Sequence, residues 1–393
     1  MMKVQQIIFR SIAILALVSG LATAQKLYAQ DTLVMNLSDA IAVGLEQNYQ
    51  IRVSRQEVRI ARNNNEPGAA GRYPSINFTA VQGNSFDNSE SRTSPGERDK
   101  LTTNFIAPSV DLTWTLFDGF RVNITKKNLE ALEEFSEGLS AVVVENTIQS
   151  IILAYYNVLL QQEKLEVFGE LKALSGDRMK YMEARRRFGN AVTFDVLQAN
   201  DAYLSDSVNY LQQELNVQNA RLLLKLLLAL DENTGFRLTE SFDVQLGEYV
   251  LDTLEARMFR NNKTLMNQYI NQKLYEYSTD LAKSDYYPGL YFGAGADYAN
   301  TRIDYASQPA STGYSFGYYA NFTLSFNLYN GGATRRAVEN ARINEEIGLI
   351  NITELRKTLG NQLVNQYDLY NIRKNLLVVA DASRESTGLN LQI

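Results

Sequence analysis

The chain contains neither cysteine nor histidine among its 393 residues. It can therefore form no disulfide framework and no Cys/His zinc or iron–sulfur site. Catalysis by a histidine-based triad or by a cysteine nucleophile is excluded for the same reason. Proline is scarce too, with 6 in the chain and none between Pro108 and Pro288. A stretch of that length without proline leaves room for helices far longer than those of an ordinary globular domain.

Neither the charge nor the remaining polar residues indicate a nucleic-acid binder or an enzyme. There are 38 Lys+Arg against 44 Asp+Glu, a formal net charge of −6, whereas phosphate neutralisation needs clustered Lys and Arg. With 45% apolar and 21% charged residues, the chain is not of the disordered class. The carboxylates are scattered, with no His or Cys partner. We therefore expect no enzyme, no cofactor and no metal site.

The N-terminus has the pattern of a secretory signal peptide. Lys3 and Arg10 give it positive charge, residues 12–18 are apolar, and residues 22–24 (Ala-Thr-Ala) form a small-x-small cleavage pattern. The alternative, a membrane anchor, is disfavoured because the apolar run is far shorter than the roughly 20 residues that span a bilayer. No later segment has 18 consecutive apolar residues, so we expect no transmembrane helix. Any membrane insertion of this exported chain must then use strands.

Four similarities in order, at an offset of about 212–214 residues, indicate an internal duplication. The clearest pairs are Leu45–Asn48 with Phe259–Asn262, Arg72–Ile76 with Tyr286–Leu290, and Leu116–Gly119 with Leu328–Gly331. Each pair alone is weak evidence for a duplication, but the pairs occur in the same order and at a nearly constant offset, which strengthens the evidence. We expect repeat 1 over residues 37–231, a linker over 232–250 and repeat 2 over 251–393.

Each repeat contains two segments in which apolar and polar residues alternate. Val110, Leu112 and Trp114 fall on one face, and Asp111 and Thr113 on the other. The pattern predicts strands at about 75–83, 105–116, 290–298 and 318–328, with extracellular loops at 84–104 and 297–315. Little charge and many tyrosines near the second pair are typical of an outer-membrane barrel. The alternative, a soluble β-sandwich, fits poorly because long helical stretches separate the strand pairs.

Long helices are indicated by heptad-like spacing after the first strand pair. Leu132, Phe135, Leu139 and Val142 are spaced by three and four residues. A helix from about Phe120 to Ala184 would have about 65 residues and measure roughly 100 Å. The adjacent residues 133–134 (Glu-Glu) are interpreted as a solvated face of this helix, not as a catalytic pair.

A second long helix is predicted from Thr193 onward, antiparallel to the first. Its apolar residues also have heptad-like spacing, which predicts a seam between the two helices with a tip near Gly189. The predicted seam consists of Leu197, Leu204, Val208, Leu211, Leu215, Leu222 and Leu226.

These features together resemble the TolC-like family of outer membrane efflux proteins. The resemblance covers nearly all of the chain after the signal peptide. Its motifs lie at residues 37–42 (LSDAIA), 73–76 (YPSI), 116–120 (LFDGF), 328–332 (LYNGG) and 189–199 (GNAVTFDVLQA). The resemblance implies a membrane α+β fold with an internal two-fold repeat. Four strands per chain would contribute to a trimeric 12-stranded outer-membrane β-barrel, continuous with a long periplasmic α-helical barrel of coiled-coil hairpins.

The resemblance also implies partners and site residues. The partners are two further copies of the chain, outer membrane lipid, a periplasmic adaptor protein and an inner-membrane pump of the RND or ABC type. Gly189, Asn190, Ala191 and Val192 would meet the adaptor, and Asp195 would line the periplasmic entrance. From the residues alone, Asp195 could instead simply favour the start of its helix, with Thr193 as N-cap.

Two further groups of residues are candidates. The aromatics Trp114, Phe117, Phe326 and Tyr329 are expected at the periplasmic membrane interface, or alternatively in packing between subunits. The basic cluster at residues 185–187 is either a solvated face or a set of ion pairs within a closed entrance. It is also a departure from the family, in which an aromatic follows the first arginine of this motif.

The implied function is that of a passive exit duct from the periplasm to the cell exterior, in tripartite efflux or type I secretion. A second departure from the family is that the counterpart of Gly189–Leu230 is absent from repeat 2, so we expect roughly 50 residues beyond Ile393. This leaves an alternative open. The chain could be a non-conducting helical interaction or structural protein of the periplasm, or a defective truncated fragment.

Overall fold

The computed structural model describes residues 33–90, 98–240, 246–305 and 309–390. The predicted signal peptide, residues 1–24, lies outside the described residues. The chain forms two compact units, each built from two separate segments. Among the described residues, the first comprises residues 33–49 and 146–240, and the second comprises residues 50–90, 98–145, 246–305 and 309–390.

The first unit is organised around the middle of helix α4 (Arg121–Arg187). Helix α2 (Leu37–Gln47), helix α5 (Thr193–Leu227) and the short parallel strands β1 (Leu33–Met35) and β4 (Phe236–Leu238) complete it. Apolar side chains from all five elements form one core, which buries apolar area and so stabilises the unit. The largest buried members are Met35, Ile151, Tyr155, Val158, Leu224, Leu228 and Phe236.

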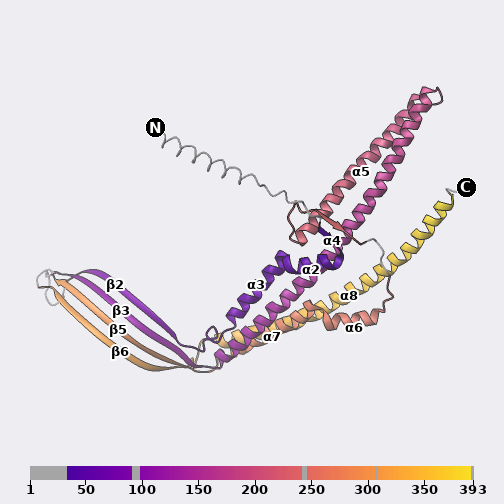
Figure 1. The fold of residues 1–393 in the computed structure, drawn as a ribbon. Coiled ribbons are helices and arrows are strands. Elements are labelled where there is room, and N and C mark those ends of the chain that lie inside the picture. Colours follow the sequence, from indigo (N-terminus) through magenta and orange to yellow (C-terminus); the bar gives the residue numbers. More distant parts are fainter. Residues whose placement is uncertain (1–32, 91–97, 241–245, 306–308, 391–393) are drawn as a thin grey trace, which may run out of the picture. The chain divides into compact units, whose positions relative to one another are not determined.

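Helices α4 and α5 run side by side as a hairpin (Figure 1). The prediction that the seven apolar residues of α5 form the seam between α4 and α5 is wrong, because all seven side chains are between 47% and 65% exposed in the chain. The buried stripe of α5 instead consists of one leucine together with smaller or polar residues: Val196, Ala199, Gln213, Val217, Ala220 and Leu224. Heptad spacing reveals that an apolar face exists but not which neighbour covers it, and α5 has two such faces.

Glycines in α4 make room for tyrosines of α5 in this hairpin. A Cβ at Gly176 would lie 3.3 Å from a ring carbon of Tyr203, and a Cβ at Gly169 would lie 3.6 Å from the ring of Tyr210. Both pairs are spaced by seven residues, so the same arrangement recurs two helical turns along. Each tyrosine thereby occupies the space that a side chain at the opposite position would fill.

The second unit contains the remaining helices. These are α3 (Tyr49–Asn64), α6 (Leu251–Asn261), α7 (Lys263–Ser284) and α8 (Ala333–Asn390), with the first turns of α4. Between α2 and α3, the chain leaves the helical conformation at Asn48, with ψ 130°. Asn262 separates α6 from α7 in the same way, with ψ 118°. Its side chain accepts a hydrogen bond from Leu265 N and so caps α7.

Helix α7 packs closely against α4 and α8 at two glycines. A Cβ at Gly138 of α4 would lie 2.1 Å from Oδ1 of Asn267, and a Cβ at Gly348 of α8 would lie 2.1 Å from Oε1 of Gln272. Gln272 donates to the carbonyl of Glu345 at 3.1 Å, which fixes its amide. Only glycine at these two positions admits the buried amides.

The second unit also contains a four-stranded antiparallel sheet of order β2-β3-β5-β6 (Figure 1). The strands span Ser75–Glu90, Arg98–Asp118, Gly289–Tyr305 and Ser311–Ser325. Both predicted loops are therefore too long, because residues 84–90, 98–104, 297–305 and 311–315 are strand, while residues 91–97 and 306–308 lie outside the described residues. Their polar composition was mistaken for loop, although alternate positions of a strand tolerate polar residues.

One described helix is long and apolar enough over 18 residues to cross a bilayer, by length and composition only. This helix is α4, so the expectation of no such segment was too strong. The same helix supplies Ile151, Tyr155 and Val158 to the core of the first unit, where their side chains are fully buried. Of the apolar window itself, 22% is buried within the described part of the chain, so burial inside one copy accounts for only part of its hydropathy.

Candidate functional site: the strand sheet and the hairpin tip

The two faces of the sheet have different chemistry. Register places Phe78 opposite Val110, and Trp114 opposite Phe292, which in turn faces Phe322. The rings of Phe292 and Phe322 are 5.0 Å apart, and Phe322 is 69% exposed. The chain therefore has a broad apolar sheet face that the described residues leave uncovered.

The opposite face carries a polar group that spans three strands. Tyr319 of β6 donates a hydrogen bond to Asp111 of β3 at 2.9 Å, and Ser109 donates to the same carboxylate at 2.8 Å. Tyr319 passes over β5 at Gly295, where a Cβ would lie 2.6 Å from its ring. Asp297 lies on this face too, opposite Gly317. Glycines thus accommodate large polar side chains on one face only.

The outer edges of the sheet are open within the described part of the chain. β2 pairs only with β3, and β6 pairs only with β5, so each has one row of backbone N–H and C=O groups without a strand partner. β2 and β6 are 16 and 15 residues long. An open edge of that length is a template for pairing with another chain.

The junction from β3 into α4 is built from aromatic rings and a tight turn. Gly119 and Phe120 both have positive φ, of 66° and 68°. The Phe120 ring packs edge-on against Phe117 at 5.2 Å and Tyr287 at 6.0 Å. Arg121 forms an ion pair with Asp285 beside them. The turn therefore joins the strand to the helix through ring contacts as well as backbone.

The four predicted interface aromatics fall on two different kinds of backbone. Trp114 and Phe117 lie near the end of β3, and the Trp114 indole donates to the carbonyl of Arg72 at 3.0 Å. Phe326 and Tyr329 lie beyond the end of β6, because that strand stops at Ser325 and not at residue 328. They are 51% and 87% exposed. Their place at a membrane interface stays a prediction.

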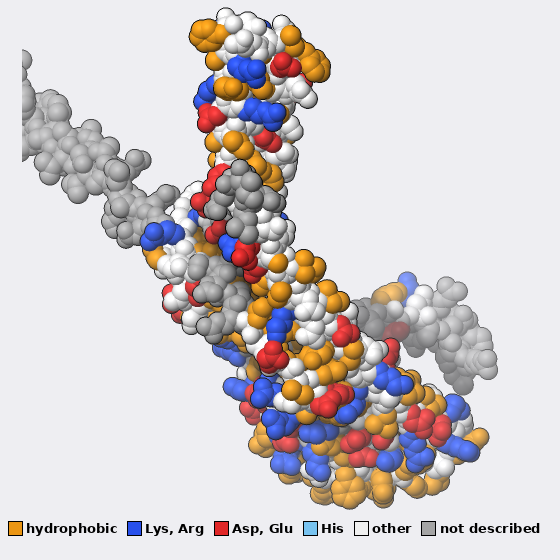
Figure 2. Space-filling view, turned by 90° about the vertical axis from the view of Figure 1, so that its right-hand side faces the viewer, with side chains coloured by type: hydrophobic (Ala, Val, Ile, Leu, Met, Phe, Trp, Pro, Cys, Tyr) orange, Lys and Arg blue, Asp and Glu red, His pale blue; other side chains and the backbone are white. Residues whose placement is uncertain are grey.

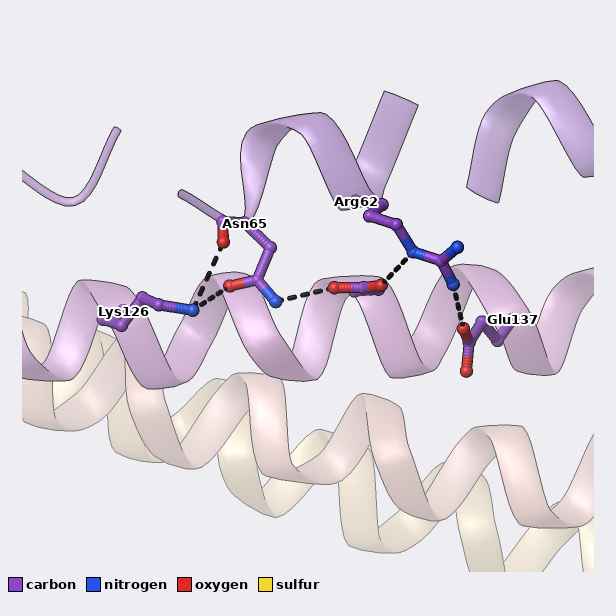
Figure 3. A network of polar contacts seen from close by, with 5 residues as sticks. Arg62, Asn65, Lys126 and Glu137 are labelled. Carbon is purple, nitrogen blue, oxygen red and sulfur yellow. Dashed lines mark hydrogen bonds and ion pairs between the residues drawn. The ribbon is translucent and has the colours of Figure 1, made fainter. Parts of the chain in front are cut away.

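A network of polar contacts joins α3 to α4 (Figure 3). Arg62 donates to Glu133 at 2.8 Å and to Glu137 at 3.1 Å, and Asn65 donates to Glu133 at 2.6 Å. The ammonium of Lys126 bonds the backbone carbonyl and the side chain of Asn65. Every member except Asn65 is charged, and the contacts connect residues that are 61 to 75 positions apart in sequence.

The network lowers the pKa of Glu133. The hydrogen bond from Arg62 is the main cause, followed by the bond from Asn65. The reciprocal interaction raises the pKa of Arg62. Glu134 pairs with Lys273 at 3.3 Å and is exposed, which agrees with the interpretation of residues 133–134 as a solvated face, whereas Glu133 is partly buried among its contacts. Only the helix packing brings these residues together, so no local sequence signal could have found the network.

The hairpin tip is a short turn at residues 188–192. Gly189 has φ +78°, and its amide and that of Asn190 bond the carbonyls of Arg186 and Arg185 at 3.0 and 2.8 Å. No atom lies within 4 Å of the position of a Cβ on Gly189. Glycine is therefore suited to this position by its backbone conformation and not by lack of space.

The N-terminus of α5 differs from the prediction by one residue. Val192, not Thr193, occupies the N-cap position, and its backbone amide donates to Oδ2 of Asp195 at 3.2 Å. Asp195 is therefore the acidic residue of the first turn of α5, which agrees with the alternative that it favours the start of this helix. The predicted tip residues Gly189–Val192 form the turn, and Asp195 lies in the first turn of the helix that follows it. Their contact with a partner and their place in a pore stay predictions.

A sequence comparison with protein families finds the family "Outer membrane efflux protein" over residues 41–230. No protein of curated function matches the chain in sequence. Among solved structures, CusC is similar at 14% identity and TM-score 0.64, over 92% of this chain and 82% of CusC. The outer-membrane channel OprN is similar at 17% identity and TM-score 0.65, over 91% and 81%. VceC, an outer membrane protein of Vibrio cholerae, is similar at 12% identity and TM-score 0.62, over 89% and 81%.

The fold is therefore that of outer-membrane channels with long helices. The resemblance of the chain to the TolC-like outer membrane efflux protein family is confirmed, by sequence over residues 41–230 and by fold over about nine-tenths of the chain. Proteins of this family are efflux channels and not enzymes.

Proposed function

We propose that the chain is one subunit of a homotrimeric exit duct in the outer membrane of a Gram-negative cell, with a helical extension into the periplasm. Its sheet would form one third of a 12-stranded barrel, and its helices part of an α-helical barrel. The duct would be passive: solutes would cross a water-filled lumen, and the chain itself would neither catalyse a reaction nor supply energy. The apolar sheet face would meet lipid, and the polar face would line the lumen.

The observation that carries this proposal is the sheet with one apolar face, one polar face and two open edges. In lipid, each unpaired backbone group costs several kcal/mol, so a four-stranded sheet cannot span a bilayer alone. With four strands in the order β2-β3-β5-β6, the two edge strands run in opposite directions. β6 of one copy can therefore pair antiparallel with β2 of the next, and such pairing closes a ring.

Each helix of the hairpin also has an apolar seam in addition to the one it uses within the chain. The seam on α5 is the one predicted as internal, including Leu204, Leu211 and Leu215. A corresponding set on α4 has its members spaced mostly by seven residues: Leu153, Leu160, Val167, Leu171, Leu174 and Tyr181, all at least 40% exposed. A helix with two seams packs between two neighbours, as the staves of a barrel do.

The internal two-fold repeat is part of the same proposal. Asn48 and Asn262, which the sequence repeat aligns, both interrupt paired helices. Gly119 and Gly331, also aligned, both have positive φ after a strand. A duplicated strand–strand–helix unit supports a barrel because each repeat supplies the same pair of strands.

Through its resemblance to the family, the duct would work with a periplasmic adaptor and an inner-membrane pump of the RND or ABC type. Gly189, Asn190, Ala191 and Val192 would contact the adaptor, and Asp195 would lie at the entrance. Three such carboxylates around a pore would attract cations. The transported compounds would be small molecules or polypeptides selected by the pump.

The absence of cysteine allows a direct test of the trimer, because any introduced pair is the only pair. Thr79→Cys on β2 would be combined in turn with Cys at Tyr319, Asn321 and Thr323 on β6. Oxidation of the outer membrane fraction should give dimers and trimers for at least one combination. The control is Thr113→Cys with Asn321→Cys, which β5 separates within one sheet. Cross-linked trimers that conduct in planar bilayers would support the duct, and only monomers without conductance would contradict it.

A further inference from the structure

Three consecutive arginines end helix α4 at the hairpin tip. Arg185, Arg186 and Arg187 are all exposed. Consecutive helical residues point about 100° apart, so the three guanidinium groups fan around the helix end instead of lining one side. Within the described residues none of the three forms a side-chain hydrogen bond or ion pair, and Arg185 only lies over the Tyr181 ring at 5.8 Å.

The tip is locally basic in an acidic chain. Residues 184–194 contain three positive charges and no negative one, whereas the whole chain has a net charge of −6. The acids that flank this segment are Glu183 before it and Asp195 after it, and one oxygen of Asp195 accepts the Val192 amide. The helix dipole favours cations at this end of α4. That effect accounts for a cation in the last turn, but not for three that point in different directions.

Apolar side chains are exposed among these charges. Phe188 is 81% exposed, Phe194 69% and Val192 63%. Figure 2 shows apolar and basic side chains together at the end of the hairpin, at the top of the view. Arginine and aromatic residues are the types enriched at the centre of protein interfaces. Exposed apolar groups rimmed by charge mark a surface for a protein partner.

We propose that this tip patch, defined as Arg185–Phe188 with Val192 and Phe194, binds a protein whose contacting surface carries acidic side chains around an apolar recess. The inference rests on the proposed function, in which the tip meets an adaptor, and it adds the chemistry of that partner. Carboxylates would pair with the guanidinium groups, and the recess would receive the Phe188 ring. The positive charge also sets the specificity, because a basic partner surface would be repelled.

The test uses the full chain purified in detergent and two synthetic helical hairpins as probes. The probes share one sequence with an apolar turn, and differ only at three flanking positions that are Glu in one and Gln in the other. At about 50 mM salt, the Glu probe should bind at least ~10-fold more tightly, and the ratio should fall as salt rises. Equal affinities for the two probes would overturn the proposal.

Variants assign the effect to the tip. R185Q/R186Q/R187Q should reduce the ratio to about 1, whereas the control K164Q/R335Q/R384Q removes the same charge from exposed residues outside the tip patch and should leave the ratio unchanged. Conductance of the same preparations separates the two proposals. A conducting wild-type chain without probe discrimination refutes only the acidic partner, and loss of both refutes the duct as well. If R185Q/R186Q/R187Q raises basal conductance without changing the ratio, the arginines pair within the trimer and the proposal fails.

Discussion

Two neighbouring residues at the start of α4 show how the strand-to-helix turn depends on side-chain identity. Gly119 and Phe120 are both in the left-handed region, which suits glycine but costs a bulky residue of the order of 1–3 kcal/mol. In the aligned turn, both residues are glycines, Gly331 and Gly332. Phe120 is held in this conformation by its contacts with Phe117 and Tyr287. The ring contacts offset the backbone cost, and the first junction is thereby tied to the end of α7.

Gly119→Ala should therefore destabilise the protein by about 2 kcal/mol or more. The new Cβ would have to adopt φ +66° and would lie 2.3 Å from the carbonyl oxygen of Ser284. Gly360→Ala is the matched control, because Gly360 is inside helix α8 and no atom lies within 4 Å of its Cβ position. It should stabilise by up to about 1 kcal/mol. Thermal unfolding of both variants, followed by circular dichroism, should give midpoints on opposite sides of the parent, and midpoints on the same side would contradict the argument.

The pKa of Glu133 leads to a prediction on acid stability. Because its folded pKa is lowered below the ordinary 4.5, its contribution is fully present above about pH 4.5 and is lost as the pH falls through the folded value. Glu133→Gln should therefore lower stability at pH 7 and show a smaller further loss toward about pH 3. Glu163→Gln, at an exposed residue of the same helix, serves as control and should keep the parent's pH profile. Identical profiles for the parent and Glu133→Gln would contradict a stabilising role for the network.

At the scale of elements, periodicity determined much of what could be predicted. Alternation identified all four strands of the sheet, and heptad spacing with the absence of proline gave α4 nearly its full length of 67 residues. These signals are local. The break at Asn48, the network around Glu133 and the choice of buried face on α5 depend on which helix lies alongside. A period of 3.5 is the same for an internal seam and for one that faces another copy, so the leucines were assigned to the wrong neighbour.

The exposed seam of α5 should stabilise the assembly and not the hairpin itself. Leu204→Ala with Leu211→Ala removes apolar surface that is 52% and 60% exposed in the chain. We expect fewer detergent-resistant trimers on native gels, with the helical content of the protein retained. Val217→Ala is the contrast, because Val217 is only 8% exposed and its loss should cost about 1–2 kcal/mol in hairpin stability. If Leu204→Ala with Leu211→Ala instead unfolds the hairpin and leaves the trimer fraction unchanged, the seam is internal after all.

At the scale of the whole molecule, the two faces of the sheet make opposite demands on their surroundings. Tyr318 and Phe322 lie on the apolar face, and Tyr319 and Asn321 on the polar one. No single copy can satisfy both faces and both edges, because the described residues cover neither the apolar face nor the outer edges of β2 and β6. A closed ring of three copies in a bilayer would satisfy all of them at once, with lipid outside and water inside.

Two lysines placed three residues apart on β6 test this arrangement. Tyr318→Lys puts a charge in the middle of the strand on the apolar face, where Tyr318 is 84% exposed. A lysine facing lipid costs up to about 2–4 kcal/mol at the bilayer midplane, and a trimer would contain three. This variant should therefore be depleted from the outer membrane fraction. Asn321→Lys adds the same charge to the polar face, so it should still assemble, and its channels should conduct cations less well than the parent because the lumen becomes more positive. Equal depletion of both variants would show that the faces are not distinguished by lipid, and depletion of Asn321→Lys alone would reverse the assignment of lumen and membrane.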